Sequence, residues 1–260
     1  MDIVKLVDNL HLEDLKNPMH PSIFDENDNY DMLIVRLPII ENKLELISIG
    51  FIITSDNSYI YIREKDVFEE LGSRFEAPYQ ILDTTIDELL KSFEAYRDLI
   101  IDMEEALYLN KTKKSFINRW LELKRNIVRI ERVLMHASTT MDKMIEYYTD
   151  TQKFPINHYM DLHEHLERTL HSSKLQLSKL DYLYNFHSAQ TNEKMNHLIY
   201  ILTIISAIFL PLNLVVGFFG MNTSGLPFSN EVSGTNSVVT FMIFMSIFML
   251  GIIYFVKKRI

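Results

Sequence analysis

Two long runs without a charged residue lie near the C-terminal end of the sequence, and they constrain the fold more than any other feature. The first is Leu198–Phe219 with 22 residues, and the second is Val238–Val256 with 19. At about 1.5 Å per residue the first run forms about 33 Å of helix, which is enough to cross a bilayer. One buried helix of a soluble protein can be equally apolar, but two such runs in succession favour two membrane helices, with membrane parts 198–219 and 238–256.

The charges around these runs predict their orientation. Lys257-Lys258-Arg259 follows the second run, and the positive-inside rule places that end in the cytoplasm. Because an even number of spans returns the chain to its starting side, we expect both termini in the cytoplasm of a multi-pass inner-membrane protein. Residues 220–237 would then form a periplasmic loop and 257–260 a basic cytoplasmic tail. The N-terminal segment lacks the basic and apolar parts of a secretory signal, and a sequence without cysteine fits the cytoplasm.

The part of the chain before the spans is acidic. It holds 23 Lys+Arg, which is the total of 26 less the three C-terminal cations, and 34 Asp+Glu, which is the total of 35 less Glu231. An acidic domain attracts cations and repels nucleic acid. We therefore expect the partners of this chain to be cations and the lipid bilayer, and not nucleic acid.

Residues 1–80 are predicted to form a small α/β domain. The apolar runs at 31–40 and 45–62 are rich in β-branched residues and predict strands. The segment 63–72 is expected to form a helix that ends on Gly72. Glycine is then absent from Ser73 to Val216, so this stretch is predicted to be helical and the whole chain to be an α+β membrane protein.

Three helices are predicted in the glycine-free stretch. An acidic helix over 85–110 and a basic helix over 115–148 are expected to form an antiparallel hairpin, the domain 81–154, with opposite charge on its two arms. After Pro155 no helix breaker occurs for 55 residues. One helix is therefore predicted from Ile156 to Phe219, about 95 Å long, in a segment 155–222 that continues from a cytoplasmic stalk into the membrane.

Polar and small residues share one face of this long helix. At heptad spacing, two interleaved series form a seam at 3.5 residues per turn. The series are Leu175, Tyr182, Ala189, Asn196, Thr203, Leu210, Gly217 and Ser178, Asn185, Asn192, Ile199, Ser206, Asn213, Gly220. Small residues also let two helices pack closely, but the asparagines favour a water-filled pore, because a polar face must point at protein or water. Two spans cannot enclose a pore, so several copies of the chain are required.

The segment Leu202–Asn222 ends in Gly220-Met221-Asn222 and resembles the first membrane helix of the CorA family of magnesium and cobalt channels, whose signature is Gly-Met-Asn at its outer end. The resemblance implies a homopentamer in which the long helices line the pore and the Gly-Met-Asn loops form its mouth. It implies transport of Mg²⁺, and also of Co²⁺ or Ni²⁺. Because Mg²⁺ sheds water reluctantly and prefers oxygen ligands, a ring of Asn222 side chains can accept hydrogen bonds from the hydrated ion.

The resemblance also implies which residues line the pore and which ion passes. The family's pore stripe falls on Asn196, Leu202, Leu210, Asn213 and Gly217, the face that the heptad seam gives. Leu202 and Leu210 would be apolar constrictions that close by dewetting. Phe219 and Asn213 replace the family's usual Tyr and Thr, and the loop after Asn222 lacks an early acidic residue. Its Gly225-Leu226-Pro227 turn resembles that of the zinc-transporting, ZntB-like branch, so a zinc transporter is the alternative.

Candidate regulatory metal ligands lie on the stalk part of the long helix. In the family, acidic residues of this helix bind Mg²⁺ between subunits and hold the pore closed. Asp161 matches such a position, Glu164 matches it less closely, and His165 lies one turn after Asp161 on the same face. An ordinary solvated face is the alternative. A second acidic run, 25–31, lacks the glycine and the glutamate of a calcium loop and is expected to be a solvated loop.

Two other classes of protein could carry two spans. A signalling protein needs a folded sensor domain between them, and the 18 residues from Gly220 to Ser237 are too few. A membrane-anchored enzyme needs a catalytic motif, and the sequence has no phosphate-binding glycine loop, cysteine nucleophile or His-Glu-x-x-His motif. The sequence therefore predicts a pore-forming subunit that is not an enzyme and has no resident cofactor.

Overall fold

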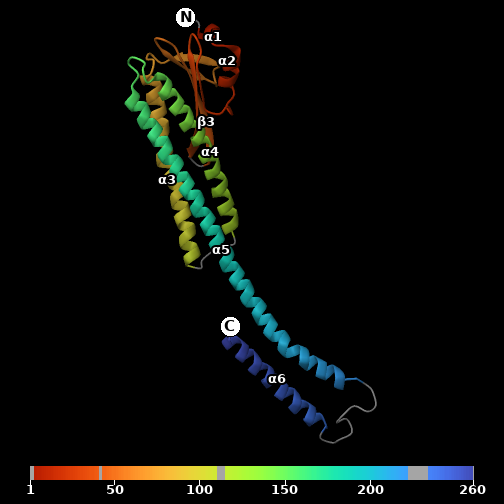
Figure 1. The fold of residues 1–260 in the computed structure, drawn as a ribbon. Coiled ribbons are helices and arrows are strands. Elements are labelled where there is room, and N and C mark those ends of the chain that lie inside the picture. Colours follow the sequence, from red (N-terminus) through yellow and green to blue (C-terminus); the bar gives the residue numbers. More distant parts are fainter. Residues whose placement is uncertain (1–2, 41–42, 110–114, 222–233, 260) are drawn as a thin grey trace. The chain divides into compact units, whose positions relative to one another are not determined.

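The computed structural model describes residues 3–40, 43–109, 115–221 and 234–259. The chain divides into two compact units, Met1–Asn185 and Phe186–Ile260. These are called the N-terminal and C-terminal units below. The helix α5, Ile156–Phe219, contributes to both units (Figure 1).

The N-terminal unit begins with two short helices, α1 (Ile3–Leu6) and α2 (Asn9–Lys16), and continues as an antiparallel sheet. The strands are β1 (Ile23–Asp25), β2 (Asp31–Ile40), β3 (Leu44–Ile53), β4 (Ser58–Ile62) and β5 (Val67–Glu70). Their order in the sheet is their order in the chain. Each strand therefore pairs with the next one, which is the simplest topology for short connections.

The strand β2, which lies between β1 and β3, is covered on both faces. Met32 and Ile34 point to one side, where they join Leu15 and Tyr61 in a buried cluster under α1 and α2. The alternate residues, beginning with Leu33, point to the other side, where α3 (Glu76–Tyr108) and α4 (Phe116–Tyr148) contact β2 (Figure 1). This burial on both faces explains why the strand reads as a continuous apolar run rather than an alternating one.

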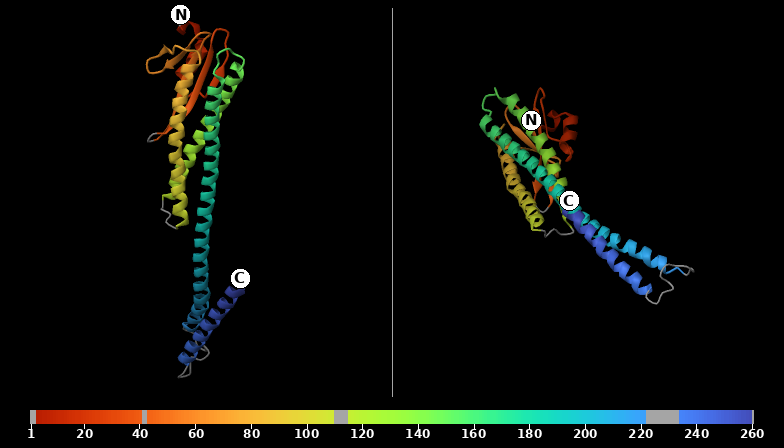
Figure 2. Two further views of the ribbon diagram at one scale, coloured as in Figure 1. Left: turned by 90° about the vertical axis from the view of Figure 1, so that its left-hand side faces the viewer. Right: turned by 60° about the horizontal axis from the view of Figure 1, so that its bottom comes forward.

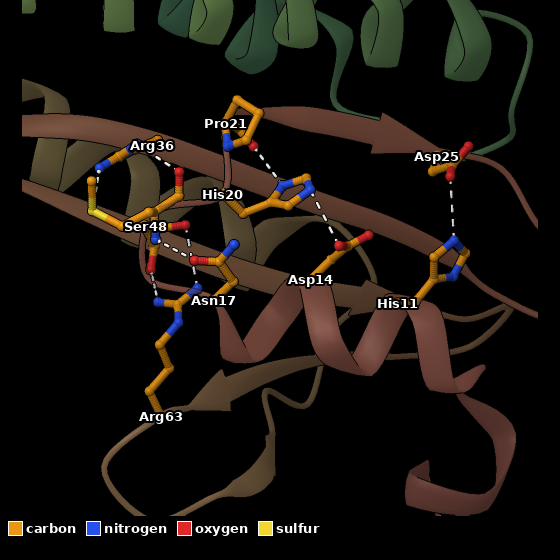
Figure 3. A network of polar contacts seen from close by, with 10 residues as sticks. His11, Asp14, Asn17, His20, Pro21, Asp25, Arg36, Ser48 and Arg63 are labelled. Atoms are coloured by element: carbon orange, nitrogen blue, oxygen red, sulfur yellow. Dashed lines mark hydrogen bonds and ion pairs between the residues drawn. The ribbon is translucent and has the colours of Figure 1, made fainter.

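The helix α2 lies directly on the backbone of the sheet. A Cβ atom added to Gly50 would lie 2.3 Å from Cδ2 of the buried Leu15, so glycine is needed there to let the helix approach. Polar contacts add to this packing. Arg63 donates from Nε to the Leu15 carbonyl at 2.8 Å, and it also donates to the Ser48 carbonyl (Figure 3). One arginine of the β4–β5 turn thus ties α2 to β3.

The helix predicted over 63–72 is wrong. Residues 63–66 form a turn, with hydrogen bonds from the amides of Lys65 and Asp66 to carbonyls three residues earlier, and Val67–Glu70 is strand β5. In this hairpin Phe68 pairs with Tyr61, and their ring centroids lie 5.0 Å apart. Cross-strand aromatic packing outweighs the helix propensity of the charged residues. Gly72, with φ of 76°, follows the strand and does not end a helix.

The predicted helical hairpin is present, but α3 begins at Glu76, nine residues before the predicted start at Thr85. Pro78 lies in its first turn, where a missing amide hydrogen costs nothing. The buried residues Pro78, Leu82 and Ile86 then continue one apolar face. The second arm, α4, begins at Phe116 and ends at Tyr148, as predicted to within one residue.

Among the described residues, the opposite charges of α3 and α4 do not pair with each other. In the part of the chain that the structure describes, the ion pairs between helices are Lys124 to Asp181, Lys179 to Glu104, and His158 to Glu76. Each of them joins α3 or α4 to α5. Figure 2 shows α3, α4 and the first part of α5 lying side by side. Charged residues of α3 and of α4 therefore hold α5 through these ion pairs.

The C-terminal unit contains the end of α5 and the helix α6, Gly234–Arg259. As predicted, α5 is one helix from Ile156 to Phe219, and it continues through Pro211. Both α5 and α6 contain an apolar stretch long enough to span a membrane, and that stretch is not buried inside the chain. The predicted fold class, an α/β N-terminal part with a long helix and two apolar C-terminal helices, is confirmed.

Candidate ion pathway

The seam of the membrane part of α5 is exposed in a single chain. Leu202 and Leu210 are 63% and 69% exposed, and Ile199 is 52% exposed. The other seam residues are also exposed, except for the half-buried Ser206: Asn196, Thr203, Asn213 and Gly217. Because the rest of this span is largely exposed as well, the seam differs from its surroundings by its chemistry and not by its accessibility.

The seam offers neutral oxygen atoms and no carboxylate. The Thr203 hydroxyl donates to the Ile199 carbonyl at 2.8 Å, so its hydrogen is used within the helix, and its oxygen can still accept a hydrogen bond. Asn196 and Asn213 add amide oxygens on the same face. Such groups accept hydrogen bonds from the water shell of a cation without holding the ion as tightly as a carboxylate would.

Gly220 lies directly after the end of α5. Its amide donates to the Val216 carbonyl at 2.8 Å, and a Cβ atom added to Gly220 would lie 2.9 Å from that same oxygen. The Met221 amide donates to the Phe218 carbonyl at 3.4 Å. The predicted filter residue Asn222 lies outside the described residues, so the structure describes two of the three residues of the Gly-Met-Asn sequence.

The stalk residues chosen as regulatory ligands form one close pair. His165 Nε2 lies 3.8 Å from Asp161 Oδ1, one turn away on α5, whereas Glu164 accepts from Arg168 at 2.7 Å. Among the described residues no group of three or more His, Asp or Glu side chains is arranged to hold a metal ion within one chain. Asp161 and His165 would thus need further ligands from water or from a second chain.

The sequence suggested a solvated loop at 25–31. In the structure this acidic run is not uniformly solvated. Asp31 is only 6% exposed, and Tyr148 of α4 donates its hydroxyl proton to Asp31 Oδ2. Two effects raise the pKa of Tyr148: its burial, which is the larger, and this hydrogen bond to a carboxylate. At the other end of the run, Asp25 lies 3.2 Å from His11 Nε2 (Figure 3). The run is therefore tied to α2 and α4 and is not a calcium loop.

A cluster that the sequence analysis missed holds the stalk where the N-terminal unit ends. Trp120 of α4 donates from Nε1 to the Leu180 carbonyl at 2.8 Å and stacks on Tyr184 with ring centroids 4.6 Å apart. Lys124 lies 2.5 Å from Asp181 and over the Trp120 ring. We call Trp120, Lys124, Leu180, Asp181 and Tyr184 the stalk clamp. The single tryptophan of the chain, near the start of α4, was the signal that could have indicated it.

A second contact joins the stalk to α4 farther from the clamp. The Ser138 hydroxyl donates to the Glu167 carboxylate, and its oxygen lies 3.1 Å from His163 Nε2. Ser138 is 3% exposed, and buried polar groups are normally satisfied in this way. Helix α5 is thus fixed to α4 at two levels, so a displacement of the stalk must break specific polar contacts.

Comparison of the amino-acid sequence with known proteins finds a matching family and several relatives. The sequence pattern of the family described as "CorA-like Mg2+ transporter protein" matches residues 3–258. The cobalt/magnesium transport protein CorA of Thermotoga maritima is 23% identical over an alignment 272 positions long. The alignment covers 96% of this chain and 76% of that protein. The zinc transport protein ZntB of Yersinia enterocolitica is 22% identical over 182 residues, which cover 68% of this chain and 53% of that protein.

Solved structures show the same fold. The complete structure of the CorA magnesium transporter from Methanocaldococcus jannaschii superposes with a TM-score of 0.77 at 17% identity, covering 96% of this chain and 84% of that one. The full-length CmaX protein superposes with a TM-score of 0.71 at 16% identity, covering 97% of this chain and 81% of that one. At these identities the likeness concerns the fold.

Proposed function

The chain belongs to the CorA-like Mg²⁺ transporter family, and from this premise we propose that it is the pore-forming subunit of a homopentameric channel that admits Mg²⁺ across the inner membrane. Its membership makes it a divalent-cation transporter. The observation that carries the finer proposal is the polar seam of α5, from Asn196 to Gly217, which one chain leaves exposed. Five copies around an axis would turn these seams toward one another and toward water.

The proposed path of the ion follows this seam. Gly220, Met221 and Asn222 of each subunit form the outer mouth, where Asn222 oxygens bind the hydrated ion. Thr203, Ser206 and Asn213 supply neutral acceptors farther along, and Leu202 and Leu210 form the apolar constrictions. A pore of this kind selects by hydrogen bonding to bound water and closes by excluding water. In this arrangement both termini lie in the cytoplasm.

The filter proposal is tested by metal flux into proteoliposomes. We expect Asn222→Ala to lower Mg²⁺ entry at least tenfold, because the ring of amide oxygens is lost. Asn230→Ala, in the same loop but outside the Gly-Met-Asn sequence, is the matched control and should transport like the wild type. If Asn222→Ala carries Mg²⁺ as fast as the wild type, the filter is elsewhere.

Assembly is tested separately by the mass of the protein in mild detergent. A pentamer has five times the chain mass of 30.7 kDa. A monomer under conditions that preserve transport would contradict the shared pore, since one α5 and one α6 cannot enclose a channel.

We also propose that Asp161 and His165 bind a regulatory cation together with ligands from a neighbouring subunit, with Glu164 nearby. The 3.8 Å approach of the two side chains supports this. The double variant Asp161→Ala/His165→Ala should lose the protection from proteolysis that divalent cations give to the closed channel. Glu164→Ala, whose side chain pairs with Arg168, should lose less of it. Unchanged protection in the double variant would refute the site.

Zinc is the second candidate ion. Two observations favour it. The sequence Gly225-Leu226-Pro227 resembles that of the zinc-transporting branch, and the imidazole of His165 lies beside Asp161, where Zn²⁺ accepts nitrogen ligands more readily than Mg²⁺ does. The flux assay with Mg²⁺, Co²⁺, Ni²⁺ and Zn²⁺ decides between the two. Faster entry of Zn²⁺ than of Mg²⁺ at equal concentration would favour the zinc transporter.

A further inference from the structure

A basic pocket lies in the N-terminal unit, where the last residue of β2, Ile40, and the first of β3, Leu44, meet α3 and α4. Its volume is about 510 Å³, which falls in the range of small-molecule sites. The β2–β3 hairpin runs along α3 (Figure 2). None of the residues proposed for the ion path or for the regulatory cation lines this pocket.

The pocket is positively charged in an acidic chain. Among the described residues, Lys43, Arg119, Arg125 and Arg129 line it, together with one carboxylate, that of Glu122, although the chain has a net charge of −9. Arg125 and Arg129 lie one turn apart on α4, where like charges repel. In the described part of the chain, no ion pair joins any of these three arginines to a carboxylate. An anion bound between them would relieve this repulsion.

The remaining wall of the pocket is apolar. Tyr96 and Leu99 of α3 and Leu123 of α4 form part of it, and Tyr96 and Leu123 are 6% and 4% exposed. Asn126 donates from Nδ2 to the Tyr96 hydroxyl at 3.1 Å, which fixes both side chains and leaves the Asn126 carbonyl oxygen as an acceptor. A ligand that fits both walls has an anionic end and an apolar or planar body.

We propose that this pocket binds a phosphate-bearing organic anion of about the size of a nucleotide. A guanidinium group presents two parallel donors that match the oxygens of a phosphate, and three of them gathered in one pocket can neutralise a di- or triphosphate. The apolar wall would cover the organic body and exclude water from it. A bound ligand would also bridge the β2–β3 hairpin to the α3–α4 hairpin and so stabilise the N-terminal unit.

Calorimetric titration of the full chain in detergent with ATP tests this proposal. The buffer is free of metal ions, because ATP chelates Mg²⁺ and would otherwise deplete the transported ion. We expect saturable binding that weakens at least tenfold in Arg125→Gln/Arg129→Gln. Inorganic triphosphate should bind at least tenfold more weakly than ATP, because it lacks the body that the apolar wall covers. Arg132→Gln, an exposed arginine of α4 outside the pocket, is the matched control and should bind ATP like the wild type.

The single variant Arg129→Lys guards against loss of folding in the double variant. It keeps the charge but removes the forked donor, and we expect it to weaken ATP binding several-fold with an unchanged helical circular-dichroism spectrum. Three results would overturn the proposal: no binding of ATP to the wild type, equal loss of binding in Arg132→Gln, or triphosphate binding as tightly as ATP. If ATP does not bind and the double variant breaks the oligomer, the pocket is instead a contact between copies of the chain.

Discussion

Gly220 has a place in the chain that a residue with a Cβ atom cannot take without a shift of the helix end. An added Cβ would lie 2.9 Å from the Val216 carbonyl oxygen, a distance that Cβ atoms do not tolerate. The amide of Gly220 already donates to this oxygen. Glycine thus sets the position at which the chain leaves α5 toward Met221.

From this we predict that Gly220→Ala lowers Mg²⁺ flux several-fold while the oligomer stays intact. The helix end must move, and the Gly-Met-Asn mouth moves with it. Gly251→Ala on α6 is the control, because a Cβ there meets no described residue within 4 Å. Flux through Gly220→Ala equal to that of the wild type would mean that the helix end does not position the filter.

Tyr61 gives a prediction about pH. Two effects raise the pKa of Tyr61 to about 12: its burial, which is the larger, and its hydrogen bond to Asp66. Since the unfolded value is about 10, the folded chain keeps a proton that the unfolded chain loses. The resulting stability is complete below pH 10 and is lost as the pH rises toward 12. Tyr61→Phe should therefore reduce the fall of the unfolding temperature between pH 10 and 12. An equally steep fall in this variant would contradict the assignment.

Asp31 shows where single residues escape sequence analysis. Its run of acidic neighbours indicated a solvated loop, yet its carboxylate is buried against Tyr148, which lies 117 positions away in the chain. No local pattern encodes such a partner. By contrast, the absence of an EF-hand was predictable, because a calcium loop requires particular residues at fixed local spacing.

At the scale of the elements, the long helices were predictable and the short β-hairpin was not. The stretch without glycine, in which Pro78 and Pro155 are the only prolines before Pro211, indicated α3, α4 and α5, because helices depend on local propensity and apolar periodicity. Strand β5 depends instead on pairing with β4, and Phe68 against Tyr61 is a contact across the sheet. The charges of α3 and α4 were read correctly, but their partner is α5.

The stalk clamp carries the prediction at this scale. Trp120→Phe keeps an aromatic ring beside Tyr184 but removes the Nε1 donor to the Leu180 carbonyl. We expect a loss of about 1 kcal/mol of stability, the usual net value of such a bond. Amide hydrogen exchange should become faster at 180–184. It should stay unchanged at 159–166, where Tyr159 and Leu162 are fully buried. Equal acceleration in both segments would show general loosening rather than release of the clamp.

For the whole molecule, the sequence indicated the two apolar helices, the fold class and the family. Membrane spans are visible as long uncharged runs and the seam as a heptad periodicity, and both are local patterns. It could not show how the N-terminal unit is built around the sheet, nor the basic pocket, since these depend on contacts between distant segments. The proposed pore depends on contacts between chains. The exposed seam of α5 therefore remains the feature on which the account of transport depends.

The chain contains no cysteine, so introduced cysteines can map the pore without background. Single cysteines at Ser206 and Asn213 lie on the seam, whereas Ile201 and Ile205 lie on the other side of α5 and are 41% and 48% exposed. In proteoliposomes treated with a charged, water-soluble thiol reagent, we predict modification and loss of Mg²⁺ flux for Ser206→Cys and Asn213→Cys, and neither effect for Ile201→Cys and Ile205→Cys. Modification of the isoleucine positions with the seam positions unreactive would contradict a pore along this face.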